Sequence, residues 1–380
     1  MRTLFDLLET DSGRGFLAER GLFTDVDEFR AALRPPVSDV LNDAVGLPPG
    51  TPLVHIGQQL CADYAPWTLT KFVAGAQLCS YDDAVPVLLW HDLYSAEAER
   101  YGQRLVLPSG SKLRGIWFAP RAAGGGEPRF IPVPRATLDQ AFRELGGWLE
   151  QAVKDRPRPE RAAARERLAA LAGAVRAAEP ETLADVDGAL AGHLLRHRLG
   201  VALPAVTLSA LLERGVLTAS LEAYLERLDD VVAVFNEAVE ALIAADVDPQ
   251  VRPLPKDHLP LHYSCPADGS RLRLTRDGSD AVATCRCGTA YRFDLHDGLG
   301  ELAATGRWSP DVSLPVHHND QAGGWIVGRS TALYGLVLNT VITEVMGGRP
   351  IPAWIPPDLT SAPRPGSEPP TLLVDHLLGP

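Results

Sequence analysis

The sequence predicts an α/β protein in which a parallel sheet carries a helical arm and a small cysteine-rich β insert. An expected strand at 52–57 and a continuously apolar strand at 85–90 flank a helical stretch at 63–79, a pattern typical of parallel βαβ units. Strand and helix patterns return at 305–355, whereas 137–246 is almost entirely helical. We therefore expect one discontinuous sheet domain, interrupted by the arm and the insert.

Length and composition limit the class of protein. A chain of 380 residues exceeds what one core usually serves, and its net charge of −12 gives no basic surface for nucleic acid. No apolar run approaches the roughly 18–20 residues of a membrane span. Acidic residues interrupt the apolar N-terminus, and five cysteines, an odd number, indicate a reducing compartment. We expect a cytoplasmic protein without nucleic-acid or membrane partners.

The composition also suggests five segments. They are the N-terminal part of a catalytic domain, a helical and coiled-coil region, the insert, the C-terminal part of the catalytic domain and a proline-rich tail: 1–136, 137–258, 259–296, 297–355 and 356–380.

The run "PLVHIGQQL" (52–60) places polar groups where the first strand is expected to end. Ligands of open α/β sheets bind beyond the carboxyl ends of the strands. Gly57 is expected to turn the chain, so that a phosphate approaches the amides of the next helix. His55 would donate to a phosphate oxygen, and Gln58 and Gln59 offer donors and acceptors. The alternative is a strand and turn with incidental polar side chains.

Three residues on the following elements are expected near this strand end. Lys71, one of only four lysines, would balance phosphate or carboxylate charge from the helix. The alternative is a solvated lysine. His91 and Asp92 end the second buried strand at the same sheet edge, which makes them candidates for orienting or general-base roles.

Further strands are expected at 104–108, 114–119 and 129–133. The glycine-rich loop 120–128 follows no phosphate-loop spacing, so we interpret it as a surface hairpin.

The helical region ends in a heptad seam over 220–243, which predicts a long helix that packs against one partner. The partner helix comes from the same chain or from a second subunit in a homodimer. The apolar seam residues are Leu221, Leu225, Leu228, Val232, Phe235, Val239 and Leu242. Earlier in this region His193 and His197 lie one helical turn apart; a solvated helix face is the favoured interpretation, and metal binding is the alternative.

Residues 259–293 have the form of a zinc ribbon, with two cysteine–glycine knuckles around short strands. The expected structural zinc ligands are His262, Cys265, Cys285 and Cys287. Asp268 is the alternative to His262 as the fourth ligand. The other alternative is a degenerate ribbon that has lost its metal.

The C-terminal part contributes expected strands at 311–316 and 324–328 and a buried helix at 330–347. His318 and Asp320 follow the first of these strands, and we expect them in the site. A polar loop with one capping aspartate is the alternative.

In two stretches the chain resembles the bacillithiol cysteine-ligase family. "GQQ" after an apolar strand and "PVLLWHD" (86–92) are similar to its N-terminal part. "WSPDVSLPV" (308–316) and "WIVGRSTALYGLVLNTV" (325–341) are similar to its C-terminal run. The resemblance covers about 50–95 and 305–352. It implies a Rossmann-like core of the synthetase and nucleotidyltransferase type with an added coiled coil.

Two departures from the family pattern concern the substrate. The acidic run after the second strand keeps only His91 and Asp92 in rough register. The family's glycine-rich run near 328 loses its glutamate and gains Arg329, which could bind a carboxylate bidentately.

The resemblance implies a ligase that joins an amino acid, cysteine by family default, to an amine of a small metabolite, with ATP as a possible cosubstrate. His55 and the following helix would stabilise phosphate charge. The two glutamines and Lys71 would position the nucleotide or acid, and Asp92 or Asp320 would hold the incoming ammonium. The alternatives are a nucleotidyltransferase that makes only an activated intermediate and a non-catalytic assembly protein.

Overall fold

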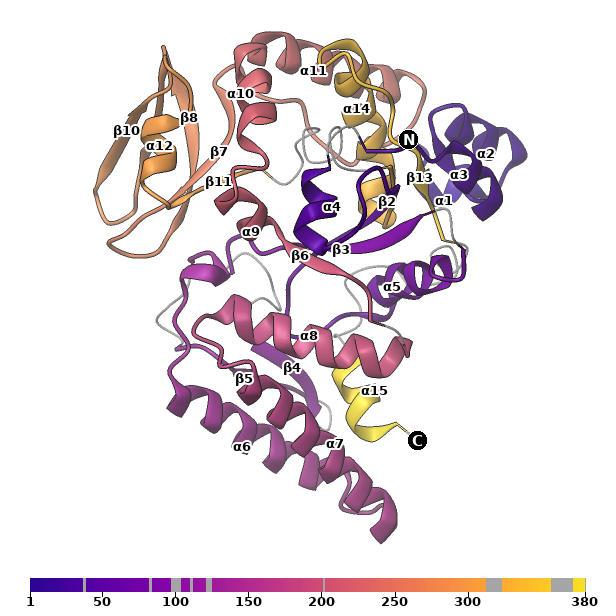
Figure 1. The fold of residues 1–380 in the computed structure, drawn as a ribbon, viewed down its shortest axis with the longest axis vertical. Helices are drawn as coiled ribbons and strands as arrows, with labels where there is room; N and C mark the ends of the chain where they lie inside the picture. Colours follow the sequence, from indigo (N-terminus) through magenta and orange to yellow (C-terminus); the bar gives the residue numbers. More distant parts are fainter. Residues whose placement is uncertain are drawn as a thin grey trace.

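The computed structural model of the protein has three parts around a central sheet: N-terminal helices, a helical arm and a β insert (Figure 1). It describes residues 1–36, 39–81, 84–96, 104–109, 112–120, 125–200, 202–311, 323–356 and 372–379.

The central sheet has six strands, all parallel, in the order β1-β13-β12-β2-β3-β6. The strands are β1 (Leu22–Phe23), β2 (Leu53–Gln59), β3 (Val85–His91), β6 (Ala205–Thr207), β12 (Gly324–Ile326) and β13 (Ala353–Trp354). Because β12 and β13, from near the C-terminus, lie between β1 and β2, the predicted discontinuous sheet is confirmed. The architecture is consistent with a Rossmann-like α/β fold.

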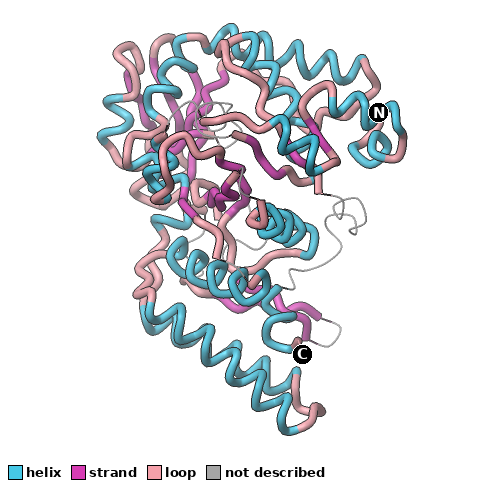
Figure 2. Tube along the Cα trace, turned by 45° about the vertical axis from the view of Figure 1, so that its right-hand side comes forward, coloured by secondary structure: helices cyan, strands magenta, loops and turns pink. Residues whose placement is uncertain are grey.

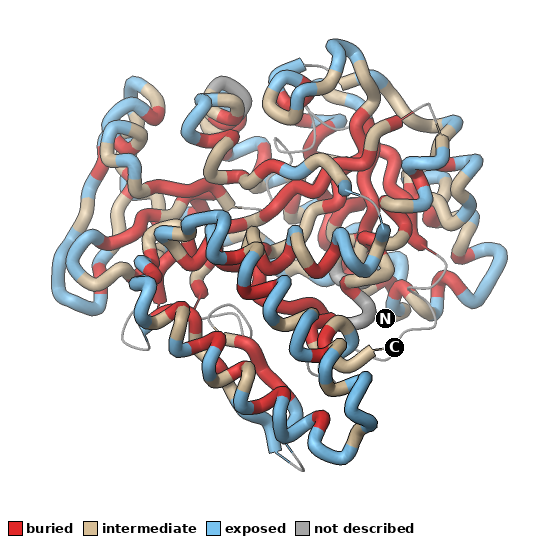
Figure 3. The backbone as a smooth tube through the Cα atoms, turned by 60° about the horizontal axis from the view of Figure 1, so that its bottom comes forward, coloured by how far each residue is buried: buried red, intermediate tan, exposed pale blue. Residues whose placement is uncertain are grey.

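Helices cover both faces of the sheet (Figures 2 and 3). The side chains of β2 alternate between two cores. Leu53 joins the core that includes α11 (Leu228–Ala244) and α14 (Arg329–Glu344). Val54 and Ile56 join the opposite core, which includes α5 (Pro66–Leu78). Burial on both faces explains why apolar side chains point to either side of the first half of the strand.

The predicted turn at Gly57 is wrong. β2 continues through Gln59, pairs with β3 over its whole length, and is separated from α5 by a loop. Gly57 lies opposite Leu89 in the ladder. A Cβ atom at Gly57 would lie 3.3 Å from Nε2 of His91, so the missing side chain makes room for that ring. The glycine therefore serves a close side-chain approach within the sheet.

The helical region forms two separate groups rather than one arm. The helices α6 (Arg135–Ala152), α7 (Arg158–Ala177) and α8 (Leu183–Leu199) form the arm, and α15 (Leu372–Leu378) packs on α7 and α8. The chain then enters the sheet as β6. It continues as α9 (Leu208–Glu213), α10 (Thr218–Glu226) and α11.

The expected continuous heptad helix is wrong, because a break at Arg227 (φ −110°, ψ 21°) divides it into α10 and α11. Asp229 and Asp230 lie in the first turn of α11, where carboxylates favour a helix N-terminus. The seam residues Leu228 and Val239 are buried in the core that contains α14. The seam is thus filled from within the chain, which is the intramolecular alternative.

Strands β4 (Arg104–Ser109) and β5 (Lys112–Trp117) pair antiparallel apart from the central sheet. The expected strand at 129–133 is wrong, because Pro128–Phe130 form a 3-10 turn. Pro132 and Pro134 follow it and lack the N–H groups that a strand ladder uses.

The insert is a five-stranded antiparallel sheet in the order β10-β9-β8-β7-β11. Its strands are β7 (His258–Ser264), β8 (Arg271–Asp277), β9 (Asp280–Thr284), β10 (Ala290–Asp294) and β11 (Trp308–Pro310), and α12 (Gly300–Ala304) precedes β11. Of the strand expected at 311–316, only Asp311 is described; it lies directly after β11 and outside any strand. Residues 312–316 lie outside the described residues.

Four short helices occupy the N-terminal part, where short helices were expected: α1 (Leu4–Leu8), α2 (Asp11–Ala18), α3 (Val26–Ala32) and α4 (Val40–Val45). Within the described ranges, no helix combines the length and apolarity needed to cross a membrane.

Candidate functional site

The carboxyl ends of the parallel strands lie along one edge of the sheet, where α/β proteins bind ligands. The chain enters this edge after β2, β3, β6 and β12, and α9 and α14 begin directly after the last two of these strands. We call Gln58, Gln59, Lys71, His91 and the first turn of α14 the sheet-edge site.

Lys71 is the buried cation of the sheet-edge site. Its Nζ donates to the carbonyl oxygen of Gly57 at 2.8 Å and to Oε1 of Gln58 at 2.7 Å. The side chain comes from α5 and is only 6% exposed, so the solvated-lysine alternative does not hold. Burial lowers the pKa of Lys71 to about 8.

The stem of Lys71 also reaches the N-terminus of α14. A Cβ atom at Gly328 would lie 3.6 Å from Cδ of Lys71. Gly328 is the N-cap residue and has no side chain with which to cap the helix. The first amides of a helix otherwise lack intrahelical acceptors and carry partial positive charge. The buried ammonium of Lys71 and the N-terminus of α14 thus lie next to each other, and both favour binding of an anionic group.

Gln59 and His91 are neighbours across the β2–β3 ladder at its carboxyl end. Both are partly exposed, and the carbonyl oxygen of His91 accepts the N–H of Leu60 at 3.0 Å. The structure therefore brings together Gln58, Gln59, Lys71 and His91, as the sequence predicted.

His55 lies elsewhere than expected. It is fully buried in the middle of β2, in register with Val87 of β3 and Trp325 of β12. Because the strand extends four residues beyond it, the expected position of His55 at the strand end is wrong. Its predicted contact with a phosphate stays untested.

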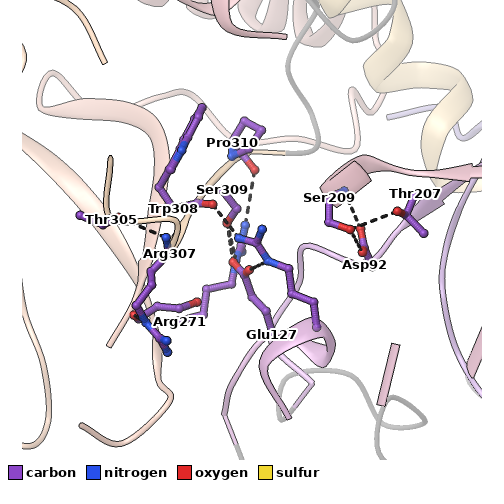
Figure 4. Close-up of polar contacts among 12 residues, drawn as sticks. Asp92, Glu127, Thr207, Ser209, Arg271, Thr305, Arg307, Trp308, Ser309 and Pro310 are labelled. Carbon is purple, nitrogen blue, oxygen red and sulfur yellow. Dashed lines mark hydrogen bonds and ion pairs between the residues drawn. The ribbon is translucent and has the colours of Figure 1, made fainter. Parts of the chain in front are cut away.

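Asp92 holds the first turn of α9. One carboxylate oxygen accepts the N–H of Ser209 at 3.0 Å, and the other accepts its Oγ–H (Figure 4). Burial raises the pKa of Asp92, although the hydrogen bonds from Ser209 oppose the rise. The group is 1% exposed. Because Asp92 is buried and both of its carboxylate oxygens accept hydrogen bonds from Ser209, an incoming ammonium does not reach this carboxylate in the structure. The catalytic role of Asp92 stays a prediction.

Three expected site residues carry no described side-chain geometry. His318 and Asp320 lie outside the described residues. Arg329 is the first residue of α14, and nothing is described of its side chain.

A buried ion cluster of Glu127, Arg129, Arg271 and Ser309 was not predicted (Figure 4). Glu127 is fully buried and accepts Nε of Arg129 at 2.8 Å and Nε of Arg271 at 3.0 Å. Ser309 donates its hydroxyl to the same carboxylate. Glu127 was assigned to a surface loop because one acid in a glycine- and proline-rich run gives no sign of burial.

The ion cluster joins the insert to the rest of the chain. Arg271 belongs to β8 and Ser309 to β11, whereas Glu127 and Arg129 lie just before the arm. Arg129 also donates to the carbonyl oxygen of Trp308 at 2.7 Å. Its charge lowers the pKa of Asp92, against the larger effect of burial.

The two knuckles of the insert bring four possible metal ligands together: Cys265, Asp268, Cys285 and Cys287. Their ligand atoms all lie within 4.8 Å of one another. Sγ of Cys265 and Sγ of Cys287 are 3.8 Å apart, and Sγ of Cys285 lies 3.2 Å from Oδ1 of Asp268. We call this group the cysteine cluster; it could bind a metal.

Each knuckle is shaped by a glycine with positive φ, 75° at Gly269 and 89° at Gly288. The N–H of Ser270 donates to Oδ1 of Asp268 at 3.0 Å, which lowers the pKa of that carboxyl.

His262 is not part of the cysteine cluster, so its expected place beside the three thiols is wrong; Asp268, the alternative, lies there instead. His262 lies within β7, opposite Arg273 of β8 and Ser309 of β11. His262 lies away from the thiols because it is still within β7, which ends at Ser264. The knuckle loop begins after Ser264 and turns Asp268 toward the thiols.

No protein-family model matches this sequence, and comparison with curated proteins found no match.

Proposed function

We propose that this protein is an enzyme of the carbon–nitrogen ligase type, which activates a carboxylate with ATP and joins it to an amine of a small metabolite. The sheet-edge site would bind the anionic group of the nucleotide or acid. The observation that supports this proposal best is the buried Lys71 ammonium beside the N-terminus of the sixteen-residue helix α14. The reaction type, with cysteine as the default amino acid, rests on the resemblance in the two stretches around this site.

The residues of the site suit charge that develops during activation. Helix amides and Lys71 are fixed donors in a poorly hydrated place, where they stabilise negative charge more strongly than in water. Gln58 accepts a hydrogen bond from the Lys71 ammonium at 2.7 Å and so holds it in place before a substrate binds. His91, at the adjacent strand end, is the candidate to orient the second substrate.

The test is nucleotide turnover. Purified protein is incubated with ATP, single amino acids and a set of small amines, and AMP, ADP and the amide product are followed by chromatography and mass spectrometry. K71M should lower turnover by about 100-fold, the usual effect of losing one oxyanion donor. K154M is the matched control, because Lys154 is 65% exposed. Equal turnover in wild type and K71M, or none with any substrate pair, would refute the scheme.

The same assay separates the alternatives. A nucleotidyltransferase would consume ATP and release pyrophosphate without any amine. A non-catalytic assembly protein would neither turn over ATP nor gain thermal stability from it.

We propose further that the cysteine cluster holds a structural zinc ion through three thiolates and the Asp268 carboxylate. Two thiolates on one tetrahedral zinc, with Zn–S of about 2.3 Å, lie about 3.8 Å apart. Cys265 and Cys287 already have this separation. Four protein ligands leave no open position, which is typical of a structural site.

A further inference from the structure

Three histidines from two distant parts of the chain meet where α15 packs on the arm. His193 and His197 lie one turn apart on α8, and His376 belongs to α15. The ring centroids are 4.3 Å apart for His193 and His197, 5.4 Å for His193 and His376, and 5.3 Å for His197 and His376. We call these residues the histidine cluster.

The spacing of the ring centroids fits coordination of one ion, although the ring nitrogens as placed do not converge as closely as the ligand atoms of the cysteine cluster. With Zn–N of about 2.05 Å, the centroids of two bound imidazoles lie about 4.5 Å apart at a right angle and about 5.2 Å apart at the tetrahedral angle. The three observed separations bracket these values. The ring planes make angles of 42°, 87° and 53°, so no pair of rings is stacked in parallel. Two rings stacked in parallel could not both point at the same ion.

Two nitrogens of the cluster are buried without a hydrogen-bond partner among the described residues: Nε2 of His193 and Nε2 of His376. A buried polar atom without a partner is costly, and a metal would satisfy it. A half-turn about χ2 exchanges ring nitrogens for carbons and leaves the centroid in place, so the rings can turn toward an ion without moving their helices.

The α15 helix is held in place independently of the histidines. The N–H of Leu373 donates to Oδ1 of Asp63 at 3.0 Å. At the other end of the helix, Arg156 donates to the carbonyl oxygen of Leu378 at 2.6 Å, and Arg167 donates to that of Leu377 at 2.9 Å. His376 is thus presented to α8 from a fixed helix, and exposed His197 leaves the cluster accessible from solvent.

We propose that the histidine cluster is a second metal site, which takes a divalent transition-metal ion such as zinc through three imidazoles and fastens α15 to α8. Imidazole is a preferred ligand of zinc, nickel and copper, and three protein ligands leave one position for water or another small ligand. The site is separate from the cysteine cluster and from the sheet-edge site.

Metal titration of the full chain tests the proposal. The C265S/C287S variant removes the cysteine cluster, and zinc binding is then followed by calorimetry and by elemental analysis after dialysis. One equivalent should remain in this variant, and adding H193Q/H376Q should weaken its binding by more than about 100-fold, since even outer-shell partners of a metal ligand contribute 10–100-fold. H296Q, at an exposed histidine of the insert, is the matched control and should change nothing.

Two further measurements keep the test decisive. H197Q changes an exposed ring, so it should fold normally and also weaken binding. Amide exchange at α15 should slow when zinc is added and should not respond to zinc in H197Q. Absence of the remaining equivalent, or an equivalent that survives both H197Q and H193Q/H376Q, overturns the proposal.

Discussion

Lys71 is an ammonium in a buried place, and its pKa decides when it carries charge. Because burial lowers this pKa to about 8, the amine is protonated at pH 7 and neutral above pH 9. An anion bound by the ammonium should therefore bind most tightly below pH 8 and lose affinity as the pH rises through it. Sulfate is a suitable probe, because its charge stays constant over pH 6.5–9.5, and calorimetry gives the dissociation constant.

The variant K71M should bind sulfate more weakly and without pH dependence. K154M, at the exposed lysine, should keep the wild-type profile. A wild-type affinity that is flat across pH 8 would show that Lys71 does not hold the anion.

Asp187 is a second buried group whose protonation affects the protein. It is fully buried on α8, and neither carboxylate oxygen has a hydrogen-bond partner among the described residues. Burial raises its pKa well above the usual value. A raised pKa stabilises the fold fully below the unfolded-state pKa, and this stability is lost as the pH rises through the folded-state pKa.

Replacing Asp187 with asparagine removes the charge and this pH dependence. D187N should be indistinguishable from wild type near pH 3 and more stable at pH 7–8, with a gain of up to about 1.4 kcal/mol per pH unit between the two pKa values. Urea unfolding at several pH values measures it. D155N, at an exposed carboxylate, is the control. Destabilisation by D187N at pH 8 would contradict the prediction.

At the scale of elements, the insert is the part whose fold should depend most on metal. Its strands are joined by knuckles that carry the cysteine cluster, and metal affinity of such a site is folding free energy. C265S should lose one equivalent of bound zinc by elemental analysis and should make 258–294 more sensitive to protease. H262Q should retain that equivalent, because His262 lies outside the cluster. Equal loss in both variants would return His262 to the ligand set.

The heptad pattern over 220–243 predicted one continuous helix, whereas the structure has two, α10 and α11. The seam residues lie on both α10 and α11, and they are buried or partly buried, as the heptad pattern predicted. Yet a heptad repeat does not tell whether the covering surface is another chain or α14 of the same chain. The break at Arg227 lets the two helices follow a globular core, which a continuous helix could not do.

At the scale of the whole molecule, Glu127 links the insert to the sheet and the arm. E127Q would leave Arg129 and Arg271 buried without their counter-charge, and breaking a buried pair in this way costs about 3–5 kcal/mol. We expect faster amide exchange in β8 and β11 and a lower free energy of unfolding in urea.

The control for this prediction is E150Q. Glu150 pairs with Arg165 on the exposed surface of the arm, where a salt bridge contributes less than about 1 kcal/mol. Similar losses in E127Q and E150Q would mean that Glu127 does not hold the insert in place.

Some of the site was predictable from local pattern, and some was not. Gln58, Gln59 and His91 were predictable because parallel strands bring their carboxyl ends to one edge, whatever the details of packing. Lys71 was predictable because it lies on the helix that follows the first of these strands and lysine is rare in this chain. His55 was misplaced because glycine suggests a turn, whereas here it makes room for a neighbouring ring within the sheet.

The sequence was enough to predict β2, β3 and β12, a parallel sheet and a cysteine-bearing insert, because apolar runs indicate burial and clustered thiols indicate possible metal ligands. The packing of distant segments was needed to show that Asp268 and not His262 lies among the three cysteines, that Glu127 is buried, and that His376 contacts His193 and His197, which lie 183 and 179 residues earlier. The physical reason is common to all three. Side-chain direction and long-range contact depend on how distant segments pack, and neither is encoded in the spacing of neighbouring residues.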